Sequence, residues 1–218
     1  MASIVLASAT MTVANHVSGK PKSPRRAPAE SEKGRARREM ILRGVIGILT
    51  RDGYRQQSLR ELAKALGLEA QHILYYFANR DDLLQCVIEL WDRDSIATQP
   101  EMNRTLPNLD LYVDAVRRSA KARGMGHLHL SLMHEAAVPT HPAHAFMKAR
   151  QSMVLKDLAE AIKAEQRAGT IPLSVDPALS ARQLSALANG LQLQAMINPD
   201  CDPGSDLAAA IAKLRGVR

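Results

Sequence analysis

Four polar side chains in a short stretch of the chain carry groups suited to molecular recognition. Arg60, Lys64, Gln71 and His72 fall on the outward positions of two brief helical patterns that meet at Gly67. Their guanidinium, ammonium, amide and imidazole groups form directed hydrogen bonds, and two of them are cationic. Such groups can bond to phosphate oxygens and to the edges of nucleotide bases. An ordinary helix hairpin inside a helical core is the alternative interpretation.

The two helical patterns have the packing features of a helix-turn-helix. Ser58 and Glu61 form a capping-box pattern that predicts a helix over 59–66, and the spacing predicts a second helix over 70–77. Ala63 is small enough for the point where the helices cross, and the turn residue Gly67 tolerates a positive φ. The apolar positions expected to join the two helices are Leu62, Leu66, Leu68, Ile73 and Tyr76. This register turns Tyr76 and Phe77 inward and Tyr75 outward.

Positive charge is concentrated around this motif. The whole chain has a formal charge of +7, and residues 20–64 hold 13 Lys and Arg against 5 Asp and Glu. Residues 1–34 are expected to form a flexible basic arm, because the stretch from Gly19 is rich in Pro, Ser and charged residues. A basic segment suits a polyanion, either nucleic acid or an anionic membrane surface, or it only solvates a tail. The cations that can enter a minor groove are Arg25, Arg26, Lys33, Arg35, Arg37 and Arg38.

Several classes of protein do not fit this composition. The two cysteines, Cys86 and Cys201, are far apart and lack zinc-ligand spacing, and no apolar run is long enough to span a bilayer. The mildly apolar start has no preceding cation, which argues against a secretory signal and leaves Met1 and Met11 as alternative starts. No phosphate-binding loop, nucleophile elbow or paired carboxylate motif is present, so we expect a cytoplasmic protein that is not an enzyme.

The stretch 41–84 carries a resemblance to a known family. Its strings RDGYRQQSLRELAKALGL and ILYYFANRDDLL are similar to the N-terminal DNA-binding domain of the tetracycline repressor (TetR) family. More weakly, ARQLSALANGLQLQAMINPD, with HPAHAF upstream, resembles the C-terminal domain of the betaine-repressor branch.

The resemblance implies a role for each residue of the predicted DNA site. Arg60, Gln71 and His72 would face base edges, with Ala70 beside them, whereas Ser58, Tyr75 and Arg80 would contact phosphates. The chemistry of these groups agrees, because glutamine pairs with adenine and arginine with guanine. The chain departs from the family pattern at Leu74, where the family usually has tyrosine.

The remaining residues indicate an all-α fold. Helical spacing predicts helices near 80–96, 108–122, 127–137, 142–168, 177–197 and 204–215, following a first helix over 35–52. We therefore expect three parts: the arm over 1–34, a three-helix helix-turn-helix domain over 35–80, and a helical ligand-binding and dimerisation domain over 81–218.

The predicted helix 177–197 is apolar on two faces. One face is expected to pack on its own domain and the other on a second copy, although a fully buried central helix is the alternative. With the last helix it predicts a homodimer interface at Leu184, Leu187, Leu191, Met196, Leu207 and Leu214.

Aromatic and thioether side chains of the predicted C-terminal domain suit an apolar cavity for a small molecule. Filling of the core is the alternative for each of them. The predicted cavity residues are Trp91, Tyr112, Met125, Met133, Phe146 and Met153.

Five histidines fall close together beside Glu135, at positions 127, 129, 134, 141 and 144. On a helix His127 and His129 point about 200° apart, so we predict neither a metal site nor a cofactor. A DNA-binding transcriptional regulator that binds a double-stranded operator, most simply a repressor released by a small effector, is therefore expected. A helical metal- or lipid-binding protein with a basic arm is the alternative.

Overall fold

The computed structural model describes residues 31–97 and 108–216 of the chain, and all regular structure within them is helical. The helices are α1 (Glu32–Asp52), α2 (Leu59–Ala65), α3 (Ala70–Leu74), α4 (Arg80–Ala97), α5 (Leu109–Lys121), α6 (Arg123–Glu135), α7 (His144–Arg167), α8 (Pro177–Ile197) and α9 (Pro203–Leu214). The predicted all-α class is confirmed. Within the described ranges, each helix falls short of the combination of length and apolar character needed to cross a membrane.

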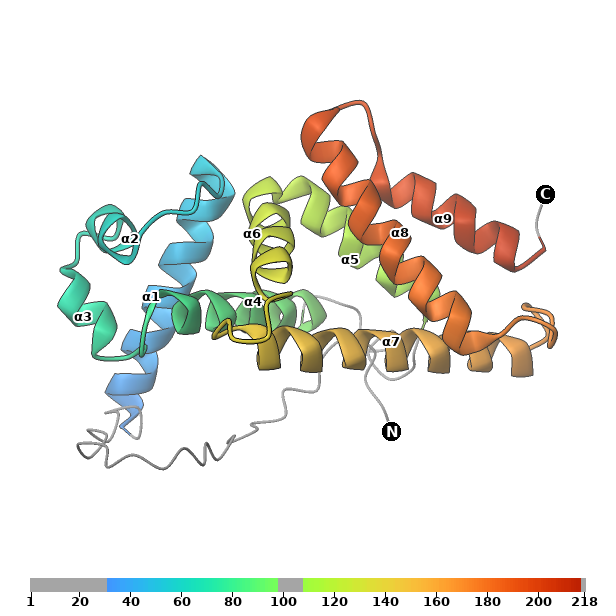
Figure 1. Ribbon diagram of the computed structural model, residues 1–218, viewed down its shortest axis with the longest axis horizontal. Helices are drawn as coiled ribbons and strands as arrows, with labels where there is room; N and C mark the ends of the chain where they lie inside the picture. Colours follow the sequence, from blue (N-terminus) through green and yellow to red (C-terminus); the bar gives the residue numbers. More distant parts are fainter. Residues whose placement is uncertain (1–30, 98–107, 217–218) are drawn as a thin grey trace.

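Helices α1, α2 and α3 lie at one end of the molecule, and α5, α8 and α9 lie toward the other (Figure 1). Helix α4 leads away from the first group, and α6 lies between the two groups. The long helix α7 runs beneath α8 (Figure 1), and the two helices are in extensive contact.

Two buried apolar clusters hold this arrangement together. The first joins α1, α2 and α3 to α4, α6 and the start of α7, around residues such as Leu49, Ile73 and Leu128. The second joins α5, α7, α8 and α9 around Val113, Ile162 and similar side chains. The first cluster extends past residue 80, where we placed a domain boundary, so the N-terminal helices share their core with α4 and α6.

The predicted helix boundaries were wrong at three places. Helix α1 begins at Glu32 and not at 35, because the Ser31 hydroxyl accepts a hydrogen bond from the Gly34 amide and caps the helix there. Helix α3 ends at Leu74 and not at Phe77. Helix α6 begins at Arg123 and not at 127.

The early start of α6 has a packing reason. A Cβ atom on Gly124 would lie 1.8 Å from the carbonyl oxygen of Leu49 in α1. Glycine is therefore required where α6 meets the end of α1, and it does not break the helix. The sequence pattern alone could not distinguish a glycine that allows two helices to approach closely from a glycine that ends a helix.

Candidate nucleic-acid interface and central cavity

Local hydrogen bonds fix the geometry of the helix-turn-helix. The Ser58 amide donates to Glu61 Oε2 at 2.7 Å, and Ser58 Oγ accepts from the Glu61 amide at 3.3 Å, so the predicted capping box is present. Gly67 has a φ of +66°, which a residue with a side chain rarely adopts. The next amide, of Leu68, turns back to the Ala63 carbonyl at 2.9 Å. Ala63 itself is buried, as its predicted place at the helix crossing requires.

The outward residues form one exposed edge of α2 and α3. Arg60, Gln71 and His72 are exposed, and Tyr75 is 59% exposed. Phe77 is buried and Tyr76 is half-buried, which confirms the predicted register of the aromatic residues. Ser58 is exposed at the start of α2, and Ala70 is half-buried at the start of α3. Their contact with DNA stays a prediction.

Arg80 is engaged within the protein. Its Nε donates to the Gln57 carbonyl at 2.8 Å, and its Nη2 donates to the Tyr54 hydroxyl at 2.7 Å. A third nitrogen lies 3.4 Å from Asp81 Oδ1. These bonds connect the start of α4 to the loop before α2, so Arg80 positions the helix-turn-helix whether or not it also contacts a phosphate.

Part of the predicted basic arm belongs to α1. Lys33, Arg35, Arg37 and Arg38 lie within the helix, and the guanidinium of Arg38 packs over the Phe77 ring at 4.9 Å from its centroid. Arg38 therefore supports the core side of the motif, and entry of these cations into a minor groove stays a prediction. Arg25 and Arg26 lie outside the described residues.

A cavity of about 120 Å³ lies among α4, α5, α6, α7 and α8. The predicted residues Trp91, Tyr112, Met125, Met133 and Met153 line it. Phe146 is not among the lining residues, and this part of the prediction was wrong. Met147, the next residue along α7, lines the cavity. Whether the cavity holds a ligand stays a prediction.

Sequence reasoning missed the polar groups of this cavity. Arg150 Nε and Nη2 bond to the two carboxylate oxygens of Asp92 at 2.8 and 3.1 Å, and this pair is almost enclosed. His129 and Gln192 also line the cavity. A sequence signal for these groups existed, because each polar residue lies four positions after a buried apolar one on a helix face that is otherwise apolar. Asp92 follows Ile88 in this way, and Gln192 follows Ala188.

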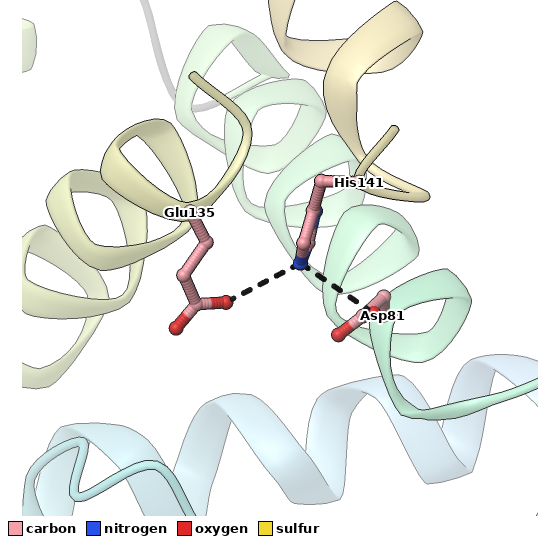
Figure 2. A group of neighbouring side chains, drawn as sticks. All are labelled: Asp81, Glu135 and His141. Atoms are coloured by element: carbon pink, nitrogen blue, oxygen red, sulfur yellow. Dashed lines mark ion pairs between the residues drawn. The ribbon is translucent and has the colours of Figure 1, made fainter. Parts of the chain in front are cut away.

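The structure disperses most of the histidines. His127 packs edge-on against Tyr54 and His134 is exposed, while a ring nitrogen of His144 lies 2.8 Å from the Ala136 carbonyl. His141 alone of the five meets carboxylates: its Nε2 lies 3.8 Å from Asp81 Oδ2 and 3.8 Å from Glu135 Oε2. Figure 2 shows this group at the junction of α4, the end of α6 and the turn before α7.

The hydrogen bonding of His141 does not suit a metal ligand. Its Nδ1 accepts a hydrogen bond from the Ala143 amide at 3.2 Å, so the proton of the neutral ring resides on Nε2. A ring nitrogen must be deprotonated to bind a metal ion, and Nε2 is the atom that faces the carboxylates. The arrangement instead suits an N–H group directed between Asp81 and Glu135, which connects α4 to α6.

The predicted dimer residues divide into buried and exposed ones. Leu184, Leu191 and Leu207 are at most 7% exposed and belong to the second apolar cluster of their own subunit, so assigning them to an interface was wrong. Met196 and Leu214 are half-buried, and Leu187 is 37% exposed. The exposed apolar side chains of α8 are Leu179, Leu187, Leu193 and Ile197.

Comparison with known proteins bears on both halves of the chain. Residues 41–87 match the model of the bacterial regulatory proteins of the tetR family. No curated protein matches the chain. Among solved structures, a TetR transcription regulator from Haloarcula marismortui ATCC 43049 is 20% identical with a TM-score of 0.65, over 84% of this chain and 97% of that one.

Two further similar structures are of a regulator with a bound ligand and of a repressor. A putative transcriptional regulator from Saccharomonospora viridis in complex with choline is 20% identical with a TM-score of 0.60, over 81% of this chain and 96% of that one. NalD, the secondary repressor of the MexAB-OprM multidrug efflux pump in Pseudomonas aeruginosa, is 18% identical with a TM-score of 0.57, over 86% and 98%. The N-terminal helices thus have the tetR-family DNA-binding fold, and the described helices as a set have the fold of such regulators.

Proposed function

We propose that this chain, whose residues 41–87 match the tetR-family model, is a cytoplasmic, dimeric transcriptional regulator that a small molecule releases from its DNA operator. The observation that carries the proposal is the exposed polar edge of α3. Gln71 and His72 are presented at the start of this helix, directly after the glycine turn. A short helix held in this way fits into a major groove and brings side chains to base edges.

In this proposal Arg60, Gln71 and His72 read the bases, and the small side chain of Ala70 allows a close approach. Ser58, Tyr75 and Arg80 contact phosphates and set the register, without reading sequence. At position 74 the family usually has tyrosine, whose hydroxyl is expected to contact a phosphate; Leu74 cannot make this contact, and the Tyr75 hydroxyl supplies it. No residue is assigned a catalytic role.

The effector is proposed to bind in the cavity, because its walls include both helices that connect to the DNA-binding end. Helix α4 contributes Ile88 and Trp91 to the wall. Arg80, the first residue of this helix, donates a hydrogen bond to the loop before α2. Helix α6 contributes Met125, next to the contact of Gly124 with α1. A ligand that favours a different placement of these helices would change the spacing of two recognition helices in a dimer.

Release by an effector requires differential affinity for the two states of the protein. A shift from nearly all competent to nearly all released dimer needs a preference of about 10⁴-fold, which an enclosed site can supply more easily than a surface. Assignment of the C-terminal helices to the betaine-repressor branch stays a prediction. Choline is the ligand in the Saccharomonospora viridis structure, and it does not identify the effector of this chain.

Fluorescence anisotropy tests the DNA-binding part of the proposal. The purified protein is titrated into a labelled duplex from the region upstream of its own gene, and into a scrambled duplex of the same composition, over a series of salt concentrations. We expect tighter binding to the first duplex, and we expect Gln71→Ala to remove most of that preference.

Other outcomes of this experiment have definite meanings. Equal binding to both duplexes, with a steep salt dependence, would mean either that the operator lies elsewhere or that the affinity comes from the cations of the basic arm alone. Absence of binding to either duplex would favour the helical lipid- or metal-binding alternative, which liposome flotation and metal titration then separate.

A further inference from the structure

The cavity wall contains a buried hydrogen-bond acceptor that receives no hydrogen bond from the described residues of the protein. Gln192 is 7% exposed, and its Nε2 donates to the Ala188 carbonyl at 3.2 Å. This bond fixes the orientation of the amide, because a carbonyl accepts and does not donate. The Oε1 atom of Gln192 is left without a hydrogen-bond donor among the described residues.

His129 supplies a second acceptor on the same wall. The ring is hydrogen-bonded to Asn189, and its buried Nδ1 has no partner among the described residues. This bond raises the pKa of His129, so the ring donates it, and because Nδ1 has no partner the donor is Nε2 and the acceptor is the side-chain oxygen of Asn189. Burial lowers the pKa of His129 to about 3, and repulsion from Arg150 contributes. The ring is thus neutral, and Nδ1 carries a lone pair.

Two buried acceptors select for a hydrogen-bond donor. An acceptor enclosed without a donor is unfavourable, and an occupant that supplies an N–H or O–H group removes this cost. An occupant of the same shape that lacks the donor leaves the cost in place. A protein site of this kind discriminates strongly against the analogue without the donor.

The rest of the wall indicates the shape of the occupant. Trp91 and four thioethers, those of Met125, Met133, Met147 and Met153, line the cavity. Thioethers pack favourably on the edges of aromatic rings. The volume is about 120 Å³, close to that of cavities of about 150 Å³ that hold a benzene molecule. One ring with a small substituent therefore fits.

The charged pair of Asp92 and Arg150 in the wall favours a neutral occupant. Both oxygens of Asp92 and two nitrogens of Arg150 are used in their mutual bonds, so this pair offers little to a charged ligand. The Arg150 cation near His129 opposes an ammonium group at the acceptor end. An anionic carboxylate would face two acceptors and gain no hydrogen bond from them.

We infer that the cavity binds a neutral single-ring aromatic compound bearing a hydroxyl group, of which phenol is the simplest, and that Gln192 Oε1 and His129 Nδ1 are the alternative acceptors for its single O–H group. The inference rests on the proposed function, because it specifies the chemistry of the effector assigned to this cavity.

Trp91 provides the measurement, since it is the single tryptophan of the sequence and lies in the wall. The full-length protein is titrated with phenol, anisole, benzylammonium and benzoate while tryptophan fluorescence is recorded, and calorimetry provides the dissociation constants. We expect phenol to bind about tenfold or more tightly than anisole, which has the ring and oxygen but no donor. The two charged compounds are expected to bind more weakly than phenol.

Variants locate the acceptor. Gln192→Leu and His129→Leu should each reduce the preference for phenol over anisole, and the double variant should abolish it. His134→Leu makes the same chemical change at an exposed position of α6 and should leave the preference intact. Circular dichroism melts of every variant establish that it is folded. Because the comparison of the four compounds uses the unaltered protein, a variant that fails to fold does not remove the test.

Several outcomes would overturn the inference. These are anisole binding as tightly as phenol, tighter binding of either charged compound, and a failure of all four compounds to bind. Failure of the proposed function has a different signature: phenol binds with the expected preference but does not change the anisotropy of the protein–operator complex. The ligand titration without DNA and the release assay with DNA therefore separate the two ideas.

Discussion

At the residue scale, the direction of a side chain was more predictable than its partner. The register of the helix-turn-helix placed Tyr75 outward and Phe77 inward, and the structure agrees. The same pattern did not reveal that Arg38 lies over Phe77, or that Arg80 bonds to Gln57 and Tyr54. Helical periodicity fixes which face a residue occupies, whereas its contacts depend on segments distant in the chain.

Arg60→Ala tests base reading against simple loss of charge. Arg60 is exposed on α2, and a bidentate contact with guanine contributes about 1–3 kcal/mol, so we expect a loss of about fivefold or more in operator affinity. Arg51→Ala is the matched control, because it removes the same charge from an exposed residue that pairs with Asp52 at 2.7 Å. It should change the affinity by less than about twofold. Equal losses in the two variants, measured by anisotropy, would contradict base reading by Arg60.

The buried histidine of the cavity predicts an acid-sensitive fold. The pKa of His129 is about 3 in the folded protein, below its ordinary value of 6.5. Above about pH 6.5 the ring is neutral in both states, and its titration does not affect stability. As the pH falls from there, the unfolded chain takes up a proton that the folded protein does not, so stability decreases until the pH reaches about 3.

Urea unfolding at several pH values measures this effect. Between about pH 7 and pH 5 the free energy of unfolding should fall by about 2 kcal/mol through His129. His129→Leu should flatten the dependence, and His134→Leu, on the exposed side of α6, should not. The same slope in all three proteins would show that His129 is not buried in its neutral form.

At the element scale, some capped helix ends were predictable, whereas the cap at Ser31 and the interhelical contacts were not. Some helix starts carry a local sequence signal: the capping box of Ser58 and Glu61 in α2, and the proline at the start of α8 and of α9. The start of α6 was misplaced because Gly124 has a role that depends on its contact with Leu49 of α1, a residue distant in the sequence. The pairing of polar groups in the cavity was not predicted for the same reason, because Asp92 and Arg150 are 58 residues apart in the sequence.

Gly124→Ala tests the contact between α1 and α6. The new Cβ would lie 1.8 Å from the Leu49 carbonyl oxygen, so the two helices must separate. We expect destabilisation of about 1–3 kcal/mol in urea unfolding. Gly47→Ala in α1 is the control, because nothing lies within 4 Å of its new Cβ. It should stabilise the protein by about 0.5–1 kcal/mol. A neutral effect of Gly124→Ala would mean that this contact is loose.

At the scale of the whole molecule, the two apolar faces of α8 have different partners. The face with Leu184 and Leu191 fills the second core of its own subunit. The other face remains uncovered in a single chain: Leu193 is 52% exposed and Ile197 is 80% exposed. The sequence correctly predicted that α8 has two apolar faces. It did not determine which face packs inside its own subunit, because the two stripes are equally apolar.

The exposed face predicts the assembly. A soluble single chain gains nothing from a row of uncovered aliphatic side chains, whereas a two-fold dimer buries the same row on both copies. The double variant Leu193→Glu with Ile197→Glu should shift the protein to a monomer in light scattering after size-exclusion chromatography. Operator affinity should fall at least tenfold with it, because one recognition helix then binds where two did.

Leu173→Glu is the control for that variant. Leu173 is 84% exposed but lies between α7 and α8 and not on the α8 face, so the same type of change should leave both mass and affinity unaltered. A monomeric mass for the unaltered protein, together with tight operator binding, would contradict the dimer directly. A double variant that stays dimeric would instead move the interface away from this face of α8, since two buried carboxylates facing two others could not be accommodated there.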